Sequence, residues 1–295
     1  MSTTFQISEG ERIFITHGID VNIRSDGRSC MDYRNILIEQ NVNETCNGSA
    51  HARSGNTDVL VGIKLELEEG NNSSQDCEWD GKSGRVQIFA DISAIASPSF
   101  EGRKGEDVTC QLEALFAEFL PQYLDLEKLI VVPGKSYFVL HIDIVILECS
   151  SFSSLIDVTS IAIKTALFDV KIPKIVVLSV EHNEFNVSDD EFEYTQFDAR
   201  KVPLVTSYTK IGSKFVIDAT WEEEQASVGT ISIAFLPPNE IVLMKKVRPG
   251  SISSDSFPSL YEMAIEFGKK LSAIFDKKIQ ENNLKNDGKI TFSLN

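Results

Sequence analysis

The sequence HIDIVILECSSFSSLIDVTSIAIKTAL, residues 141–167, is the longest nearly uninterrupted apolar stretch of the chain. Its first part, residues 141–147, is short and rich in Ile and Val, which indicates a buried strand, whereas residues 155–167 are long enough for a helix. Asp157, Ser160 and Lys164 interrupt the second part along one narrow helical stripe. The stretch therefore predicts a strand, a tight turn and a buried helix.

The turn between that strand and that helix is the first candidate functional site. Ser154 and Asp157 have the spacing of a capping box, which predicts that the helix begins at Ser154, just after Ser150 and Ser151. Unpaired backbone N–H groups and the helix dipole converge at such a helix N terminus. The turn is therefore a place where an anion can bind.

Size and composition indicate a globular chain with room for one large domain or two closely packed lobes, because 42% of its 295 residues are hydrophobic. The longest apolar run, around residues 142–147, is far below the roughly 20 residues that span a bilayer. The N terminus has neither a basic start nor an apolar segment. We therefore expect neither secretion nor a membrane anchor.

The five cysteines and the net charge exclude several classes of function. The cysteines are widely spaced and never form a C-x-x-C pair, which predicts free thiols in a reducing compartment and neither a disulfide framework nor a zinc site. A net charge of −16 argues against broad electrostatic binding of nucleic acid. Any RNA contact is therefore expected to be local or shared with partners.

The remaining chain alternates between strand and helix patterns. Strands are predicted at residues 36–38, 50–53, 59–67, 85–92, 172–178, 204–210, 214–220, 230–236 and 241–247, and helices at 9–17, 112–120 and 257–280. Each half thus combines several strands with covering helices, which is typical of an α+β fold. The predicted divisions are an N-terminal arm with a short helix (1–30), a first lobe (31–180), an acidic connector (181–198), a second lobe (199–282) and a loose tail (283–295).

Four segments together resemble the RNase PH family of phosphate-dependent 3′ to 5′ RNA-trimming proteins. They are RSDGR (24–28), GNTDVLVG (55–62), HIDIVILECSS (141–151) and KIGSKFVIDATWEEE (210–224), and they span most of the chain. The resemblance implies two related βαβα-type lobes, the ribosomal protein S5 domain 2-like fold, with antiparallel-rich sheets covered by helices. It also implies a reaction in which inorganic phosphate attacks the 3′-terminal phosphodiester and a nucleoside diphosphate leaves.

The resemblance also shows where this chain departs from active members. Their phosphate clamp is a Gly-Gly-Thr-Arg-type turn, and Ser153 stands here at the position of the Arg, beside Phe152. Their acids are a Glu-Asp pair and a second Asp six residues later, where this chain has Glu224 and Thr230. The chain therefore lacks the Arg and one of the acids, and we expect no catalysis, no bound metal and no cofactor.

The segments GRSCMDYRN, ASPSFEGRKGED and LECSS further resemble a non-catalytic ring subunit of the eukaryotic RNA exosome. That resemblance implies four kinds of partner: other RNase PH-like ring subunits, S1/KH-type RNA-binding cap subunits, a hydrolytic exoribonuclease docked on the ring, and single-stranded RNA. It implies RNA processing and decay in the nucleus, nucleolus and cytoplasm, with no membrane partner.

Basic residues supply the candidates for RNA contact. Arg103 and Lys104 are expected on a Gly-flanked loop that suits a backbone phosphate, whereas Arg24 and Arg28 are expected to fix the N-terminal segment or an interface. Three other functions stay open: an active phosphate-dependent exoribonuclease that uses Glu224, an acidic scaffold that never meets RNA, and a small-molecule or nucleotide kinase. The last is disfavoured because no GxxxxGK loop is present.

Overall fold

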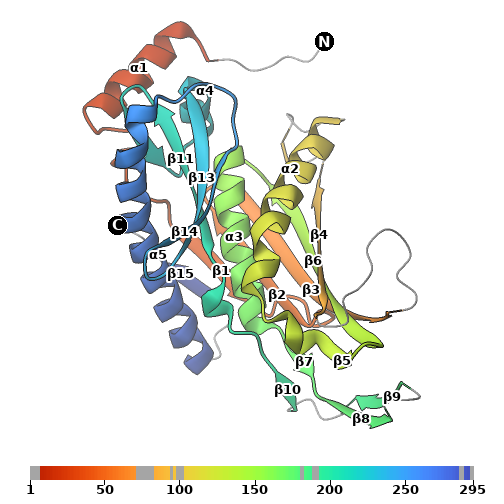
Figure 1. The fold of residues 1–295 in the computed structure, drawn as a ribbon. Coiled ribbons are helices and arrows are strands. Elements are labelled where there is room, and N and C mark those ends of the chain that lie inside the picture. Colours follow the sequence, from red (N-terminus) through yellow and green to blue (C-terminus); the bar gives the residue numbers. More distant parts are fainter. Residues whose placement is uncertain are drawn as a thin grey trace.

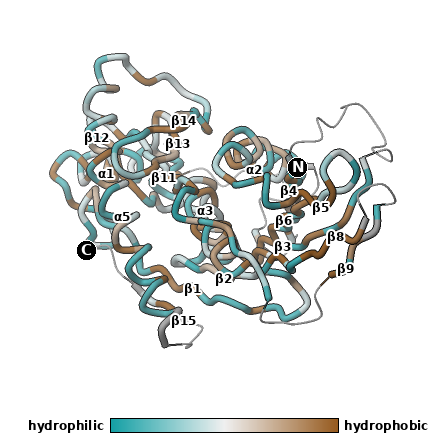
Figure 2. Tube along the Cα trace, turned by 60° about the horizontal axis from the view of Figure 1, so that its bottom comes forward, coloured by the Kyte–Doolittle hydropathy of each residue, from teal (hydrophilic) through white to brown (hydrophobic). Residues whose placement is uncertain are grey.

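Helix α3 (Phe152–Asp169) lies at the centre of the fold, between two sheets, in a computed structural model (Figure 1). The structure describes residues 7–70, 83–93, 96–97, 103–179, 183–187, 193–285 and 289–292. Almost the whole helix is buried, and hydrophobic residues of both sheets surround it (Figure 2). The predicted strand, turn and buried helix are confirmed, because α3 follows strand β6 (Ser136–Glu148) after a short turn.

The first sheet covers one side of α3 and has the order β15-β1-β2-β3-β6-β4, with β5 beside β6. All its pairings are antiparallel except the one between β4 and β6, which α2 (Arg103–Phe119) connects. The strands are β1 (Ile36–Gln40), β2 (Gly48–Ser54), β3 (Thr57–Glu69), β4 (Arg85–Ile92), β5 (Ile130–Val132) and β15 (Lys289–Phe292). The meander predicted from alternating apolar residues is thus present.

The second sheet covers the other side of α3 and is antiparallel throughout, with the order β12-β11-β13-β14. Its strands are β11 (Leu204–Ile211), β12 (Lys214–Ile217), β13 (Gly229–Leu236) and β14 (Glu240–Lys246). The sequence predicts all four, but β12 ends at Ile217 and not at residue 220, because Thr220 is already the N-cap of α4. The short α4 (Trp221–Ala226) links β12 to β13, and the long α5 (Phe257–Lys285) packs on β11 and β13. The α+β prediction with helix-covered sheets is confirmed.

The start of α3 differs from its prediction. Its N-cap is Ser151, which has an extended backbone and accepts a hydrogen bond from the Ser154 N–H at 3.3 Å, so the helix begins at Phe152, two residues before the predicted start. Asp157 does not close a capping box; its carboxyl accepts a hydrogen bond from the Tyr33 hydroxyl instead. The spacing of Ser154 and Asp157 therefore reflects a tertiary contact and not a helix end.

The first and the last elements that the structure describes both pack on the rest of the fold. Helix α1 (Glu9–Asp20) is confirmed. Its Ile19 is buried in a small cluster with Cys30 and with Ile211 and Val216 of the second sheet. The prediction of a loose tail is wrong for residues 289–292, because they form β15 and extend the first sheet beside β1. Edge pairing of this kind uses backbone groups and leaves little trace in the side-chain pattern.

The predicted acidic connector is also partly regular. Strand β8 (Ile175–Ser179) pairs with β9 (Glu184–Val187), and β7 (Ile172–Pro173) pairs with β10 (Tyr194–Thr195). The single strand expected at 172–178 is thus two strands, and the break between them follows Pro173. Proline has no N–H group to donate a hydrogen bond to a neighbouring strand. Residues 180–182 and 188–192 of the connector region lie outside the described part of the chain.

The polar stripe of α3 is buried and faces the second lobe. Ser160 Oγ accepts a hydrogen bond from the Val205 N–H at 2.8 Å. Lys164 is fully buried, its Nζ has no hydrogen-bond partner, and the nearest carboxylate, that of Asp276 on α5, lies 3.9 Å away. Burial lowers the pKa of Lys164 to about 8, because Asp276 and Asp198 offset the desolvation only in part. Lys164 therefore costs stability when it is protonated.

Replacing Lys164 with Met should raise the free energy of unfolding at pH 7 by about 1–3 kcal/mol, because Met fills the site without a charge. The gain should shrink between pH 8 and 10.5. In that range unfolded wild-type chains bind more protons at Lys164 than folded ones, so wild-type stability rises with pH. Urea denaturation at pH 7 and pH 10 measures both effects.

The matched control is Lys277→Met on the exposed side of α5, which should change stability by less than about 0.5 kcal/mol. A Lys164→Met protein that is clearly less stable than wild type at pH 7 would show that the Lys164–Asp276 attraction outweighs the burial of the charge.

Candidate functional site

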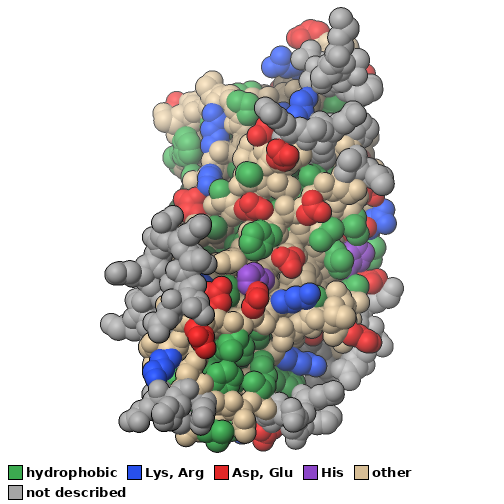
Figure 3. Space-filling view, turned by 90° about the vertical axis from the view of Figure 1, so that its right-hand side faces the viewer, with side chains coloured by type: hydrophobic (Ala, Val, Ile, Leu, Met, Phe, Trp, Pro, Cys, Tyr) green, Lys and Arg blue, Asp and Glu red, His purple; other side chains and the backbone are tan. Residues whose placement is uncertain are grey.

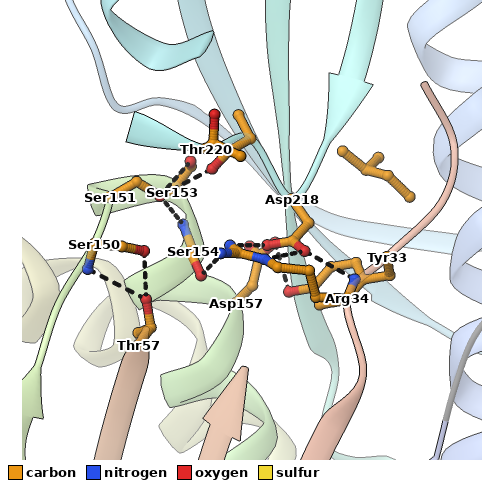
Figure 4. Close-up of polar contacts among 12 residues, drawn as sticks. Tyr33, Arg34, Thr57, Ser150, Ser151, Ser153, Ser154, Asp157, Asp218 and Thr220 are labelled. Carbon is orange, nitrogen blue, oxygen red and sulfur yellow. Dashed lines mark hydrogen bonds and ion pairs between the residues drawn. The ribbon is translucent and has the colours of Figure 1, made fainter. Parts of the chain in front are cut away.

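The turn from Cys149 to Ser154 lies where the two lobes meet, opposite β12 and α4 (Figure 4). Ser151 Oγ donates to the Ala219 carbonyl at 3.1 Å, and Ser150 Oγ lies 3.0 Å from Thr57 Oγ1. These hydroxyls are thus engaged with protein groups of both lobes. The turn is held in place without any glycine in the sequence CSSFSS.

Ser153 and Glu224, two positions that the sequence analysis singled out, are in direct contact. The Ser153 N–H donates to Glu224 Oε1 at 2.7 Å, and Ser153 Oγ donates to the same oxygen. The second oxygen, Glu224 Oε2, lies 3.1 Å from Arg248 Nη1. Ser153 is the second residue of α3, so its N–H is one of the groups that the helix itself leaves unpaired. A carboxylate of the chain therefore occupies the start of α3.

Thr230, the third of these positions, does not join this contact. It is buried on β13, directly opposite Thr209 of β11, and the two hydroxyl oxygens lie 3.2 Å apart. A threonine in this position supplies no negative charge to the site. Among the described residues, no group of three or more His, Cys, Asp and Glu side chains is arranged to hold a metal ion.

Three arginines between residues 24 and 34 bind acids of the second lobe next to the site. Arg24 makes a bidentate ion pair with Glu223, with Nε–Oε1 at 2.8 Å and Nη2–Oε2 at 2.6 Å, and both side chains are buried. Arg28 binds the Asp218 carboxylate. Arg34 binds the same carboxylate and also donates to Ser154 Oγ at 3.2 Å (Figure 4). Arg24 and Arg28 thus fix the N-terminal segment, as expected.

The acids and the thiol of this region have shifted pKa values with different causes. Burial alone would raise the pKa of Asp218, but hydrogen bonds and charge from Arg34, then the charge of Arg28, hold it below its usual range. Burial, with the charge of Asp218, raises the pKa of Asp157 well above its usual range. Burial and then the Glu224 carboxylate raise the pKa of the Cys149 thiol to about 12, so Cys149 is no nucleophile at neutral pH.

The predicted RNA contacts lie in another part of the molecule. Arg103 and Lys104 are the first two residues of α2, so their expected place on a loop is wrong; Lys104 is exposed, and the side chain of Arg103 lies outside the described part. Two residues of the site, Arg34 and Arg248, were not predicted from the sequence. No local pattern marks them, because Arg248 lies 24 residues from Glu224 and Arg34 lies 184 residues from Asp218.

Comparison with known proteins gives consistent matches along the chain. Residues 32–173 match the family described as 3′ exoribonuclease family, domain 1, and residues 201–267 match domain 2 of that family. A Thermococcus kodakarensis protein named exosome complex component Rrp42 is 32% identical over 84% of this chain and 88% of its own length. A Dictyostelium discoideum protein named, as an unproven assignment, exosome complex exonuclease RRP42 is 28% identical over 94% of this chain and 98% of its own.

Solved structures agree with the fold. A chain of an Archaeoglobus fulgidus exosome with RNA bound to the active site matches with a TM-score of 0.69 and 23% identity, over 90% of this chain and 98% of that chain. An archaeal exosome core matches with a TM-score of 0.66 and 21% identity, over 91% and 97%. The two-lobed α+β architecture is therefore that of exosome core subunits. In the described part of the chain, no helix is long and apolar enough to cross a membrane.

Proposed function

Because the chain belongs to the RNase PH family of 3′ exoribonucleases, we propose that it is a non-catalytic subunit of the core ring of an RNA exosome. Relatives that cover most of its length and are named as exosome component Rrp42 support this role. In the ring it would bind neighbouring RNase PH-like subunits, support S1/KH-type cap subunits and a docked hydrolytic exoribonuclease, and line part of a channel for single-stranded RNA. The proposed locations are the nucleus, nucleolus and cytoplasm.

The observation that best supports the proposed loss of catalysis concerns Glu224, the one acid left at the catalytic positions. Its carboxylate is already bound by other side chains of the protein. Its two oxygens contact Ser153 and Arg248, and it is almost fully buried. Ser153 and Thr230 add no charge at the other two positions. Loss of one preorganised electrostatic group typically costs about 10²–10³ in kcat, and here both the phosphate clamp and one acid are missing.

The surface supports a role in binding neighbouring subunits. On the face of the first sheet that points away from α3, Phe89 and Leu147 are 52% and 45% exposed, and Asp143 lies opposite Phe89 in the register. Figure 3 shows hydrophobic, acidic and histidine side chains together on this side of the molecule. Exposed apolar side chains with polar and charged side chains around them are a common feature of surfaces that bind another protein.

The test is co-expression of the chain with RNase PH-like partners, followed by native mass measurement and an RNA degradation assay with and without phosphate. We expect a multi-subunit ring and no release of nucleoside diphosphates that depends on this chain. In the same ring, RNA crosslinks should fall on Arg103 or Lys104. Phosphate-dependent release that is lost in Glu224→Ala would instead support an active exoribonuclease, and a ring without any RNA adduct on this chain would support a scaffold that never meets RNA.

A further inference from the structure

We propose that Glu224 is a built-in anion that fills the phosphate position at the start of α3, with Arg248 as its cation. This inference deepens the proposed loss of catalysis and rests on it. The phosphate position would then no longer bind phosphate, because the side chain of Glu224 from the second lobe occupies it.

The contacts of Glu224 are those that an oxyanion would make at a helix N terminus. One oxygen accepts the Ser153 N–H at 2.7 Å together with the Ser153 hydroxyl, and the other lies 3.1 Å from the Arg248 guanidinium. A backbone N–H at the start of a helix, a hydroxyl and a guanidinium are common partners of a bound phosphate. The carboxylate thus satisfies all three partners with a single negative group.

The position of Glu224 in the fold keeps it in this contact. It belongs to α4, whose start is fixed by a capping box between Thr220 and Glu223. The side chain of Glu224 is 5% exposed and that of Arg248 is 25% exposed, so little water competes for the carboxylate. The Ser151 Oγ contact with the Ala219 carbonyl joins the same two chain segments close by. The preorganised carboxylate therefore has a large advantage over free phosphate at millimolar concentration.

Arg248 distinguishes this arrangement from an ordinary helix cap. A cap needs only an acceptor for backbone N–H groups, whereas Arg248 comes from the segment after β14, distant in the chain from both α3 and α4, and binds the outer oxygen of Glu224. Removal of the Glu224 carboxylate should leave the Arg248 guanidinium and the Ser153 N–H next to the same vacated position. A tetrahedral oxyanion should then bind there, although none is expected to bind to the wild-type chain.

The test is thermal unfolding of the full-length chain in sodium phosphate or sulfate, against sodium chloride at equal ionic strength. Glu224→Ala should unfold at a lower temperature than wild type in chloride. About 50 mM phosphate or sulfate should raise its midpoint by about 2–4 °C, the shift expected for a ligand at about ten times its Kd. Wild type should shift by less than about 1 °C between the same buffers.

The matched control is Glu224→Ala combined with Arg248→Ala, which should lose the phosphate-specific shift because the cation is gone. Glu224→Gln keeps an acceptor for Ser153 and should show a smaller shift than Glu224→Ala, which covers the case in which the Ala variant does not fold. The proposal is overturned if wild type shows the same shift as the variants, or if no folded Glu224 variant shows one. A phosphorolysis assay decides the proposed function separately, so the two failures are distinguishable.

Discussion

Replacing Arg24 with Ala should lower the free energy of unfolding by about 3–5 kcal/mol, because Glu223 would stay buried without its cation. The side chains of Arg24 and Glu223 are 0% and 1% exposed and form a bidentate pair. Arg24 also donates to the carbonyls of Ile217 and Asp218 at 3.0 and 2.8 Å, so the substitution removes two further hydrogen bonds, although the Asp218 carbonyl keeps Arg28 Nη2 as a donor at 3.3 Å. We expect the N-terminal segment to detach from the second lobe before the rest of the protein unfolds.

Urea denaturation of the full chain measures this change, and hydrogen exchange of residues 19–34 locates it. Arg12→Ala on the exposed face of α1 is the matched control, with an expected change of less than about 0.5 kcal/mol. Arg24→Lys should fall between the two, because it keeps the charge but cannot form two parallel bonds to Glu223. A loss below about 1 kcal/mol for Arg24→Ala would mean that the buried pair is not needed for the fold.

Much of the fold was predictable because it follows from local periodicity. The apolar stretch 141–167 indicated β6 and α3, and alternating residues indicated the strands of both sheets. Where the prediction was wrong, a long-range contact outweighed a local pattern. Ser154 and Asp157 have the spacing of a capping box, but their side chains make long-range contacts instead. Asp157 accepts a hydrogen bond from Tyr33, and Ser154 accepts one from Arg34. Strand β15 exists because the edge of β1 offers it backbone partners.

The candidate site was predictable in its residue types and not in its contacts. The sequence indicated that the Arg of the clamp and one acid are replaced, since Ser153 and Thr230 stand at those positions. It did not indicate that Glu224 binds Ser153, or that Arg248 completes the contact, because a side-chain pair across two lobes has no characteristic spacing. The ion pairs of Arg24, Arg28 and Arg34 have the same character: the motif RSDGR contains Arg24 and Arg28, but it indicates neither Arg34 nor the acids that the three arginines bind.

Asp218 is the point at which the N-terminal segment, the second lobe and α3 are joined. Its carboxylate accepts hydrogen bonds from the Arg34 N–H and Nε at 2.9 and 2.8 Å, from Arg34 Nη2 at 2.5 Å and from Arg28 Nη1 at 2.9 Å. Arg34 in turn donates to Ser154 on α3. Asp218 also has a left-handed backbone, with φ of 46°, which Asn and Asp tolerate better than most residues.

Asp218→Asn should therefore lower the free energy of unfolding by about 3–5 kcal/mol at pH 7, because Arg28 and Arg34 lose the anion that they share while the backbone conformation stays acceptable. Asp218→Ala should cost about 1 kcal/mol more, since Ala adds the strain of the left-handed conformation. Denaturant titrations of the three proteins measure both differences. Equal losses for Asn and Ala would contradict the assigned role of the backbone.

The pH dependence separates the charge of Asp218 from the shape of its side chain. The folded-state pKa of Asp218 lies below its usual value of 3.8, so unfolded chains bind more protons than folded ones as the pH falls below that value. The stability that Asp218 contributes is thus complete above about pH 5 and is lost as the pH falls through its folded-state pKa. The difference between wild type and Asp218→Asn should stay constant from pH 8 to 5 and narrow below pH 4. A difference that does not narrow in acid would assign the effect to lost hydrogen-bond geometry and not to charge.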